Sequence, residues 1–189
     1  MKLVIRPLTA TLWPALEDLF GPHGASNGCW CMYWRIGRAY AERPREKNRL
    51  AFRRVVRRGP PPGLLAFDGS LAVGWCQVTP RAAIPYVEKK RFLGPVDEAP
   101  VWAISCFYVR RGYRKTGVTT ALIDAAVRIA RRAKAPALEA YPVDTDVPTA
   151  SSNLYTGTAS TFARAGFKTV ARRVPHRPVM RHDLKRRVR

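Results

Sequence analysis

The arrangement of apolar and polar residues divides the N-terminal third of the chain into one strand and two helices. Apolar and polar residues alternate over residues 2–8 and end at a proline, which predicts a short edge strand. Apolar residues three and four apart predict a helix that Thr11 can cap and Gly21 ends. The aromatic segment 21–40 is expected to be a loop. A second helix is predicted between residues 44 and 59, with a narrow buried face formed by Leu50, Phe52, Val55 and Val56.

The rest of the chain predicts a hairpin, a buried strand, a long helix and further strands. Two apolar runs flank Asp68-Gly69, a strong signal for a hairpin turn. The run VWAISCFYV over residues 101–109 has no polar alternation, which is typical of a strand buried on both faces. A helix is predicted over residues 119–133, and residues 80–99 are expected to be irregular. The remaining predicted elements are a strand at 137–141, a short helix at 157–165 and strands at 167–174 and 179–184.

Composition places the chain among ordinary globular proteins. Its 189 residues are 47% hydrophobic and 25% charged, which excludes a mainly disordered chain and favours one domain. No apolar run approaches the roughly 18 residues of a membrane span, and the start is too interrupted for a signal peptide. We therefore expect a soluble, cytoplasmic protein with no membrane partner.

The four cysteines show neither C-x-x-C spacing nor a following histidine pair. Zinc sites and a disulfide framework are therefore disfavoured, and we expect free thiols and no metal site. Cys76 and Cys106 lie within apolar runs and are expected to be core residues. For the pair Cys29 and Cys31, a structural role and a catalytic thiol both stay open.

The sign of the charge is unusual, because 34 Lys plus Arg face only 13 Asp plus Glu, a net charge of +21. This excess predicts a polyanionic partner, either a nucleic acid or a phosphorylated cofactor; a general bias toward basic residues is the alternative. The arginine-rich helix at 44–59 offers Arg49, Arg53 and Arg57 as phosphate contacts of a nucleic acid. A solvated helix face is the other interpretation of these residues.

The most informative motif is Arg114-Lys115-Thr116-Gly117-Val118-Thr119, which lies between the buried strand and the long helix. The start of a helix presents unpaired N–H groups and the positive end of the helix dipole, so this turn is an anion site. Gly117 permits close approach of a phosphate, and the neighbouring cationic and hydroxyl side chains add donors. The motif is neither a Walker A loop nor a dinucleotide G-x-G-x-x-G, which disfavours nucleotide hydrolysis and hydride transfer.

The stretch FYVRRGYRKTGVTTALIDAAVRIA resembles the acyl-CoA-binding segment of the GNAT acetyltransferase superfamily, whose signature is R-x-x-G-x-G/A. FARAGF is similar to a later helix-to-strand segment of that family, and GCWCMYWR and EAYPVD resemble a bacterial branch of it. The resemblance covers about residues 1–184, followed by a basic tail at 185–189. It implies a mixed α/β (α+β) fold. The central sheet would be mostly antiparallel, with about six or seven strands, a splayed strand pair and about four flanking helices.

The resemblance also implies a donor site in which a pantetheine arm pairs with the end of the buried strand and loop amides hold the pyrophosphate. The matching positions are Phe107, Tyr108, Val109, Arg114, Lys115, Thr116, Gly117, Val118, Thr119 and Thr120. The chain departs from the family pattern at two positions. Thr119 replaces the usual Gly or Ala, and Phe162 replaces a tyrosine that protonates the leaving thiolate in many members.

The implied reaction is attack by an amine on the acyl carbonyl of acetyl-CoA or another acyl-CoA, which forms an amide directly. Glu139 is the first candidate for the base, with a solvent-facing or arginine-paired glutamate as the alternative. Tyr155, seven residues before Phe162, is the candidate for the missing acid, with a structural tyrosine as the alternative. Weaker candidates for chemistry or substrate contact are Ser105, Asp144, Asp146 and His23.

Acceptor identity is the least determined property. Trp30, Tyr33 and Trp34 can wall a pocket for a small-molecule or protein amine, or they can form a hydrophobic plug over the sheet. Two other functions of the same fold remain open: an amide-forming transferase that uses aminoacyl-tRNA as donor, and a noncatalytic RNA-binding protein. Either a monomer or a homodimer is compatible with the sequence.

Overall fold

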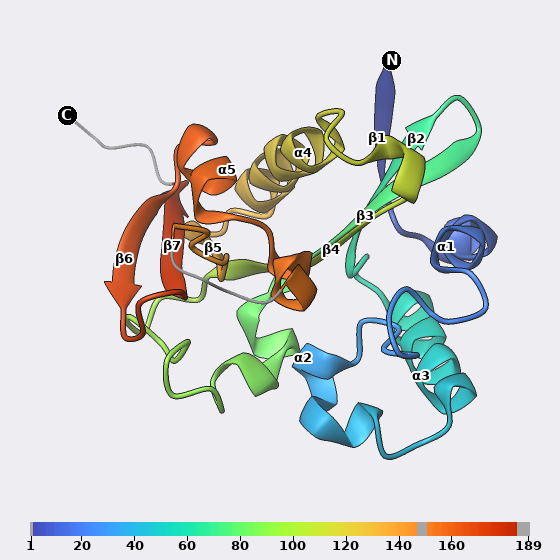
Figure 1. Ribbon diagram of the computed structural model, residues 1–189, viewed down its shortest axis with the longest axis horizontal. Helices are drawn as coiled ribbons and strands as arrows, with labels where there is room; N and C mark the ends of the chain where they lie inside the picture. Colours follow the sequence, from blue (N-terminus) through green and yellow to red (C-terminus); the bar gives the residue numbers. More distant parts are fainter. Residues whose placement is uncertain (1, 147–150, 185–189) are drawn as a thin grey trace.

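Seven strands form a single sheet in the computed structural model of the protein, which describes residues 2–146 and 151–184 (Figure 1). The predicted basic tail at 185–189 lies outside the described residues. The strand order is β1-β2-β3-β4-β5-β7-β6, and only the β4–β5 pair is parallel, so the sheet is mostly antiparallel as expected. The strands are β1 (Leu3–Pro7), β2 (Gly63–Asp68), β3 (Leu71–Pro80), β4 (Trp102–Val109), β5 (Ala137–Ala140), β6 (Lys168–Arg172) and β7 (Pro178–Asp183).

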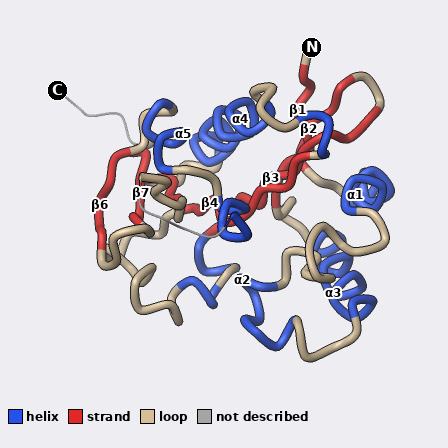
Figure 2. Tube along the Cα trace, in the orientation of Figure 1, coloured by secondary structure: helices blue, strands red, loops and turns tan. Residues whose placement is uncertain are grey.

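Helices cover both faces of this sheet (Figures 1 and 2). α4 and α5 lie over one face, and α1 and α3 lie over the other. The helices are α1 (Trp13–Phe20), α2 (Tyr33–Ile36), α3 (Arg45–Arg58), α4 (Val118–Arg132) and α5 (Ala159–Arg164). No helix in the described part of the chain has the length and apolar character needed to cross a membrane.

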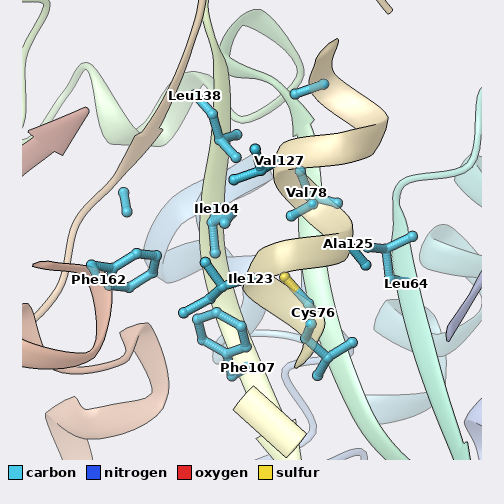
Figure 3. Packing of buried hydrophobic residues seen from close by; sticks show 14 of the residues in the cluster. Leu64, Cys76, Val78, Ile104, Phe107, Ile123, Ala125, Val127, Leu138 and Phe162 are labelled. Carbon is cyan, nitrogen blue, oxygen red and sulfur yellow. The ribbon is translucent and has the colours of Figure 1, made fainter. Parts of the chain in front are cut away.

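The core has one layer on each side of the sheet. Ile104 and Val78 of the sheet pack against Ile123 and Val127 of α4 (Figure 3). On the opposite face, Trp75 packs edge-on against Phe52 of α3, with ring centroids 6.0 Å apart. The absence of polar alternation in β4 is explained by this burial on both faces.

Three local predictions need correction. Residues 21–40 contain α2 and a 3₁₀ turn (Gly37–Tyr40), which are too short to produce a periodic pattern. α1 has no side-chain cap, and the hydroxyl of Thr11 instead lies 2.8 Å from that of Thr9. The buried face of α3 is formed by Asn48, Phe52 and Val56, whereas Leu50 is 42% exposed.

Asn48 is buried at this position because its side-chain amide is satisfied by backbone. Its Nδ2 donates to the carbonyl oxygens of Gly28 and Tyr40, each at 2.8 Å. Arg43 donates to the Asn48 Oδ1 from its Nε. A fully bonded amide can replace an apolar residue in a core, so Asn48 attaches α3 to the preceding aromatic segment.

The parallel pair β4–β5 opens toward its carboxyl end. β5 pairs with β4 only over Trp102–Ile104, and a register shift in the β3–β4 ladder makes Ser105 an extra, bulged residue. Residues 106–109 of β4 keep β3 as their partner on one side, while no strand in the described residues pairs with the other side. The expected splay is present, and it opens the sheet next to the start of α4.

Candidate active site

The turn before α4 has the backbone geometry of an anion site. Gly117 has φ +89° and precedes the first turn of α4, and no side chain caps the helix. Lys115 also has a positive φ of +63°, so the loop turns sharply twice. The first N–H groups of α4 therefore point out of the helix without a side-chain partner within the described structure.

A cavity of about 420 Å³ lies at this helix start. Most of the residues predicted for the pyrophosphate line it, including Thr119, whose branched side chain is accommodated at the cavity wall. Thr116 does not line the cavity, because its hydroxyl donates to the Tyr113 carbonyl at 2.7 Å. The lining residues are Val109, Tyr113, Arg114, Lys115, Gly117, Val118, Thr119, Thr120, Thr161 and Arg164.

Thr161 and Arg164 were not predicted as site residues. Both belong to α5, which brings a cation and a hydroxyl across from the α4 loop. The only sequence signal for them was FARAGF, which is similar to a helix-to-strand segment of the GNAT family. That similarity predicted the helix α5 but not which of its side chains face the cavity. With Arg114 and Lys115, Arg164 makes the cavity strongly cationic, which suits a diphosphate.

A second cavity, of about 300 Å³, lies on the other side of β4 and is largely aromatic. Tyr33 and Trp34 line it as predicted, and so does Tyr155. Its walls come from the segment before α3, from β3 and β4, and from the turn before α5. The lining residues are Phe20, Ala25, Ser26, Asn27, Cys29, Cys31, Tyr33, Trp34, Tyr40, Gln77, Cys106, Phe107, Tyr108 and Tyr155.

The two cavities are lined by consecutive residues at the end of β4. Phe107 and Tyr108 line the aromatic cavity, and the next residue, Val109, lines the cationic one. This is the part of β4 that β5 has left. A long ligand with a diphosphate at one end can therefore follow β4 and present its other end to the aromatic cavity.

Tyr155 is held at the aromatic cavity by the structure around it. The neighbouring Thr156 hydroxyl accepts from Arg177 Nη1 at 2.9 Å, and the same Nη1 donates to the Tyr141 carbonyl at 3.2 Å. Burial raises the pKa of the Tyr155 phenol well above its usual range, although the nearby Arg177 guanidinium opposes the shift. The phenol therefore stays protonated near neutral pH.

A model of the acetyltransferase (GNAT) family matches residues 28–156 of the chain. The protein belongs to the GNAT acetyltransferase family. The match includes the loop before α4, β4 and the segment that carries Tyr33 and Trp34. By family, the protein is an acyltransferase.

Solved acetyltransferase structures have the same fold. One of them has a TM-score of 0.62 and 20% identity, and the match covers 96% of this chain and 100% of the solved one. The PaiA N-acetyltransferase of Thermoplasma acidophilum, in complex with coenzyme A, has a TM-score of 0.54 and 16% identity over 97% of this chain and 99% of its own. The putative acetyltransferase YncA of Salmonella typhimurium, with acetyl-CoA, has a TM-score of 0.58 and 12% identity over 99% and 96%. No curated protein matches this acetyltransferase in sequence.

Phe162 lies in the core of this acetyltransferase rather than in either cavity. It is fully buried, with its ring 6.1 Å from that of Phe107 and 5.0 Å from that of Phe167 (Figure 3). A Cβ on Gly157 would come within 2.9 Å of the Phe162 ring. The phenyl group therefore packs α5 against β4, and a proton donor at the cavity must come from elsewhere.

Glu139 differs from its expected position beside the acyl site. Its side chain is 1% exposed, does not line either cavity and bridges two arginines. Arg181 donates from Nη2 at 2.7 Å, Arg81 donates from Nη1 at 3.3 Å, and the Tyr141 hydroxyl donates at 3.0 Å. A carboxylate with donors from three residues that does not line either cavity is suited to holding β5 to β7 and to the turn after β3, which agrees with the arginine-paired alternative.

Trp30 differs from the two other predicted acceptor residues. It is 4% exposed and does not line the aromatic cavity. Its ring stacks on Trp13 at 5.8 Å and packs against Phe20 at 5.4 Å, so it joins the segment before α3 to α1. Gly24 permits this packing, because a Cβ there would lie 2.2 Å from the Trp30 indole nitrogen. The plug interpretation therefore fits Trp30, and the wall interpretation fits Tyr33 and Trp34.

Three thiols line the aromatic cavity, those of Cys29, Cys31 and Cys106. Burial raises the pKa of Cys29 to about 11 and that of Cys31 well above its usual value, so both are protonated near neutral pH. A thiol rather than a thiolate is a poor nucleophile, which weighs against the catalytic-thiol alternative. In the described residues, no group of three or more His, Cys, Asp or Glu side chains is arranged to hold a metal ion.

The weaker sequence candidates do not line either cavity. Ser105 donates to Gln77 Oε1 at 3.0 Å within the sheet. Asp144 pairs with Arg172 at 2.8 Å, and its side chain accepts from the backbone N–H of Asp146. His23 Nδ1 lies 3.1 Å from Nη1 of Arg45, the first residue of α3.

The three arginines predicted for nucleic acid have different surroundings. Arg49 pairs with Glu17 and Glu46, so its charge is largely neutralised. Arg53 is exposed and lies 5.9 Å from the centre of the Trp13 ring. Arg57 is also exposed, and no acidic side chain of the described chain pairs with Arg53 or Arg57.

Proposed function

We propose that the protein is an N-acyltransferase that moves an acyl group, acetyl by default, from acyl-CoA to an amine by direct attack. The observation that carries this proposal is that consecutive residues of one strand, β4, line an aromatic cavity and a cationic cavity. Such an arrangement separates the two substrates of an acyl transfer but brings their reacting ends together.

Acyl-CoA fits the cationic cavity as donor. The open N–H groups at the start of α4 and the side chains of Arg114, Lys115 and Arg164 match the charge of a pyrophosphate. The unpaired side of β4 offers backbone partners to an amide-containing pantetheine arm. The solved relatives with coenzyme A or acetyl-CoA support the same donor class.

The reaction requires two changes of bonding and one net movement of a proton. The acceptor nitrogen attacks the acyl carbonyl carbon, a C–N bond forms, and the C–S bond to coenzyme A breaks. The leaving thiolate takes the proton of the Tyr155 phenol, which lines the cavity, and the acceptor nitrogen gives up a proton that restores the phenol. In this proposal Tyr155 is the general acid and Glu139 is a structural residue.

Removing the phenol tests the role of Tyr155. Tyr155→Phe should lower kcat for acetyl-CoA-dependent acylation about 10²-fold, the lower end of general-acid contributions because a thiolate is already a good leaving group. The Kd for coenzyme A should not change. Thiol release from acetyl-CoA measures the rate, and calorimetry measures the affinity.

Tyr86→Phe is the matched control for this change. Tyr86 packs its ring on Tyr33 at 5.3 Å but does not line the cavity, so this variant should keep wild-type kcat. An unchanged kcat in Tyr155→Phe would remove Tyr155 from the mechanism. A wild-type protein that binds no coenzyme A would overturn the proposed function itself.

The exposed arginines of α3 favour a second candidate function, transfer from aminoacyl-tRNA or binding of RNA without catalysis. Arg53 and Arg57 lie about one turn apart on α3. In addition, the buried Phe162 cannot donate a proton at the position where many family members have a tyrosine that protonates the leaving thiolate. Binding of a polyanion by these arginines would explain the net charge of +21.

Salt dependence tests this second function. Binding of bulk tRNA through about six phosphates predicts a log–log slope of about 4 in magnitude, and Arg53→Gln with Arg57→Gln should reduce it by about 1.4. Arg6→Gln with Arg128→Gln, a loss of equal charge at exposed positions away from α3, should reduce affinity much less. A slope that is the same in both double variants would exclude α3 as the RNA surface.

A further inference from the structure

We infer that the acceptor is an uncharged aromatic amine, in which the reacting nitrogen is attached directly to a flat ring. This inference rests on the proposed N-acyltransferase function and names its acceptor class. It follows from three features of the aromatic cavity: no acidic side chain lines it, the half-buried Arg35 and the buried Arg177 lie beside it, and aromatic side chains form much of its wall.

None of the 13 acidic residues of the sequence lines the aromatic cavity. The residues outside the described ranges contain no Asp or Glu side chain, so they cannot supply one. The lining groups that titrate are thiols and phenols, and burial raises the pKa of Cys29, Cys31 and Tyr155. No Asp, Glu, Lys, Arg or His side chain of the described residues lines the cavity, so an ammonium group would lose its hydration there without an ionic partner.

Two arginines beside the cavity add to this effect. Arg35 is close enough to Cys31 to influence its thiol, and it donates to the Ala83 carbonyl at 2.9 Å. Its Nε and Nη2 atoms are buried and have no hydrogen-bond partner among the described residues. Arg177 is 7% exposed and lies near Tyr33 and Tyr155. The field of both guanidinium groups disfavours a cationic acceptor.

The walls of the cavity suit a ring. Tyr33 contacts Trp34 and Tyr40 edge to face, with centroids 4.7 and 5.8 Å apart. On the other side, Tyr108 packs edge-on against Phe20 at 5.6 Å. A volume of about 300 Å³ is at the small end of ligand cavities and accepts one or two rings. Aromatic edges and faces at these angles complement a flat aromatic guest.

The proton balance is also consistent with an aromatic amine. Its nitrogen lone pair is shared with the ring, so the amine is unprotonated near neutral pH and needs no base before attack. When the C–N bond forms and the C–S bond breaks, Tyr155 gives its proton to sulfur and recovers one from nitrogen. Tyr155 alone therefore supplies the proton to sulfur and accepts the proton from nitrogen. The reaction does not need Glu139, which is buried and does not line the cavity.

Two isomeric amines test the inference with the full chain and acetyl-CoA. 4-Methylaniline and benzylamine have the same formula, but the first is neutral and the second is protonated near neutral pH. We expect kcat/KM for 4-methylaniline to exceed that for benzylamine by about 10²-fold or more, measured as thiol release and as amide product. Equal values, or a preference for benzylamine, would overturn the inference.

Binding separates failure of the inference from failure of the proposed function. If coenzyme A does not bind by calorimetry, the proposed function fails. If coenzyme A binds but 4-methylaniline neither binds the coenzyme A complex nor is acetylated, the inference fails and the function stands. If only an aliphatic amine is acetylated, the inference likewise fails and the proposed function stands.

A variant at the rim of the cavity provides a second test. Asn27 lines the cavity, is exposed and has φ +50°, a conformation that aspartate also tolerates. Asn27→Asp adds one carboxylate and should raise kcat/KM for benzylamine about fivefold relative to 4-methylaniline. Ala82→Asp, which adds the same charge at an exposed site outside the cavity, should not change the ratio. An unchanged ratio in Asn27→Asp would contradict the electrostatic basis of the inference.

Discussion

Glu139→Gln should lower the free energy of unfolding by about 3 kcal/mol and leave turnover per folded molecule unchanged. The substitution keeps the volume of the side chain but removes the charge between Arg81 and Arg181, whose side chains are only 10% and 11% exposed. Arg81 keeps its ion pair with Glu88, and Arg181 keeps its ion pair with Asp97; both acids are partly exposed. The loss of stability is therefore at the low end of the range for breaking a buried ion pair. In a domain of this size the melting temperature should fall by about 6–12 °C, which calorimetry measures.

An exposed ion pair provides the control for this experiment. Asp18 pairs with Arg110, but its side chain is 62% exposed, so Asp18→Asn should cost less than about 1 kcal/mol. If Glu139→Gln keeps the wild-type melting temperature and loses about 10²-fold in turnover, Glu139 is the general base and its structural assignment is wrong.

Gly117→Val should weaken coenzyme A binding about 10³-fold. A Cβ at Gly117 would meet no atom within 4 Å, so crowding in the free protein does not cause the loss. The cause is the φ of +89°, which a β-branched residue strongly disfavours. The loop must therefore turn differently, and the first N–H groups of α4 no longer point at the pyrophosphate. The loss of two charge-assisted hydrogen bonds from these N–H groups to the pyrophosphate, at about 2 kcal/mol each, corresponds to the expected 10³-fold loss of affinity.

Gly112→Ala is the matched control in the same loop. Gly112 has open space around its Cβ position and no positive φ, so alanine fits without strain. Its Kd for coenzyme A by calorimetry should equal that of the wild-type protein. If Gly117→Val also binds coenzyme A normally, the pyrophosphate does not occupy the start of α4, and the placement of the donor is wrong.

The elements that form the donor site were predictable because their signals are local. α4 has a strong helical period, β4 is a continuous apolar run, and Asp68-Gly69 marks the hairpin. The turn at Gly117 is an anion site for reasons that lie within a few residues of backbone. The contribution of Arg164 from α5 was not local, and sequence reasoning missed it.

The acceptor side depended on contacts between distant segments. Trp30 and Tyr33 are three residues apart, yet one packs against α1 and the other lines the cavity, because Cys31 and Trp30 both have positive φ and turn the chain between them. No local pattern predicts such a turn in residues other than glycine. The position of Tyr155 at the cavity depended in the same way on Arg177, which donates a hydrogen bond to the neighbouring Thr156.

The sequence by itself determined the order of the elements, the glycine turn before the long helix and the excess of positive charge, because each follows from residue type and short-range spacing. The mostly antiparallel sheet was expected only from the resemblance to the GNAT family. Only the tertiary structure decided that Glu139 is neutralised by arginines 58 and 42 residues away and that the acids lie away from the aromatic cavity. The physical reason is that burial and electrostatic environment are properties of the packed molecule. A side chain acquires them only when segments far apart in the sequence come together.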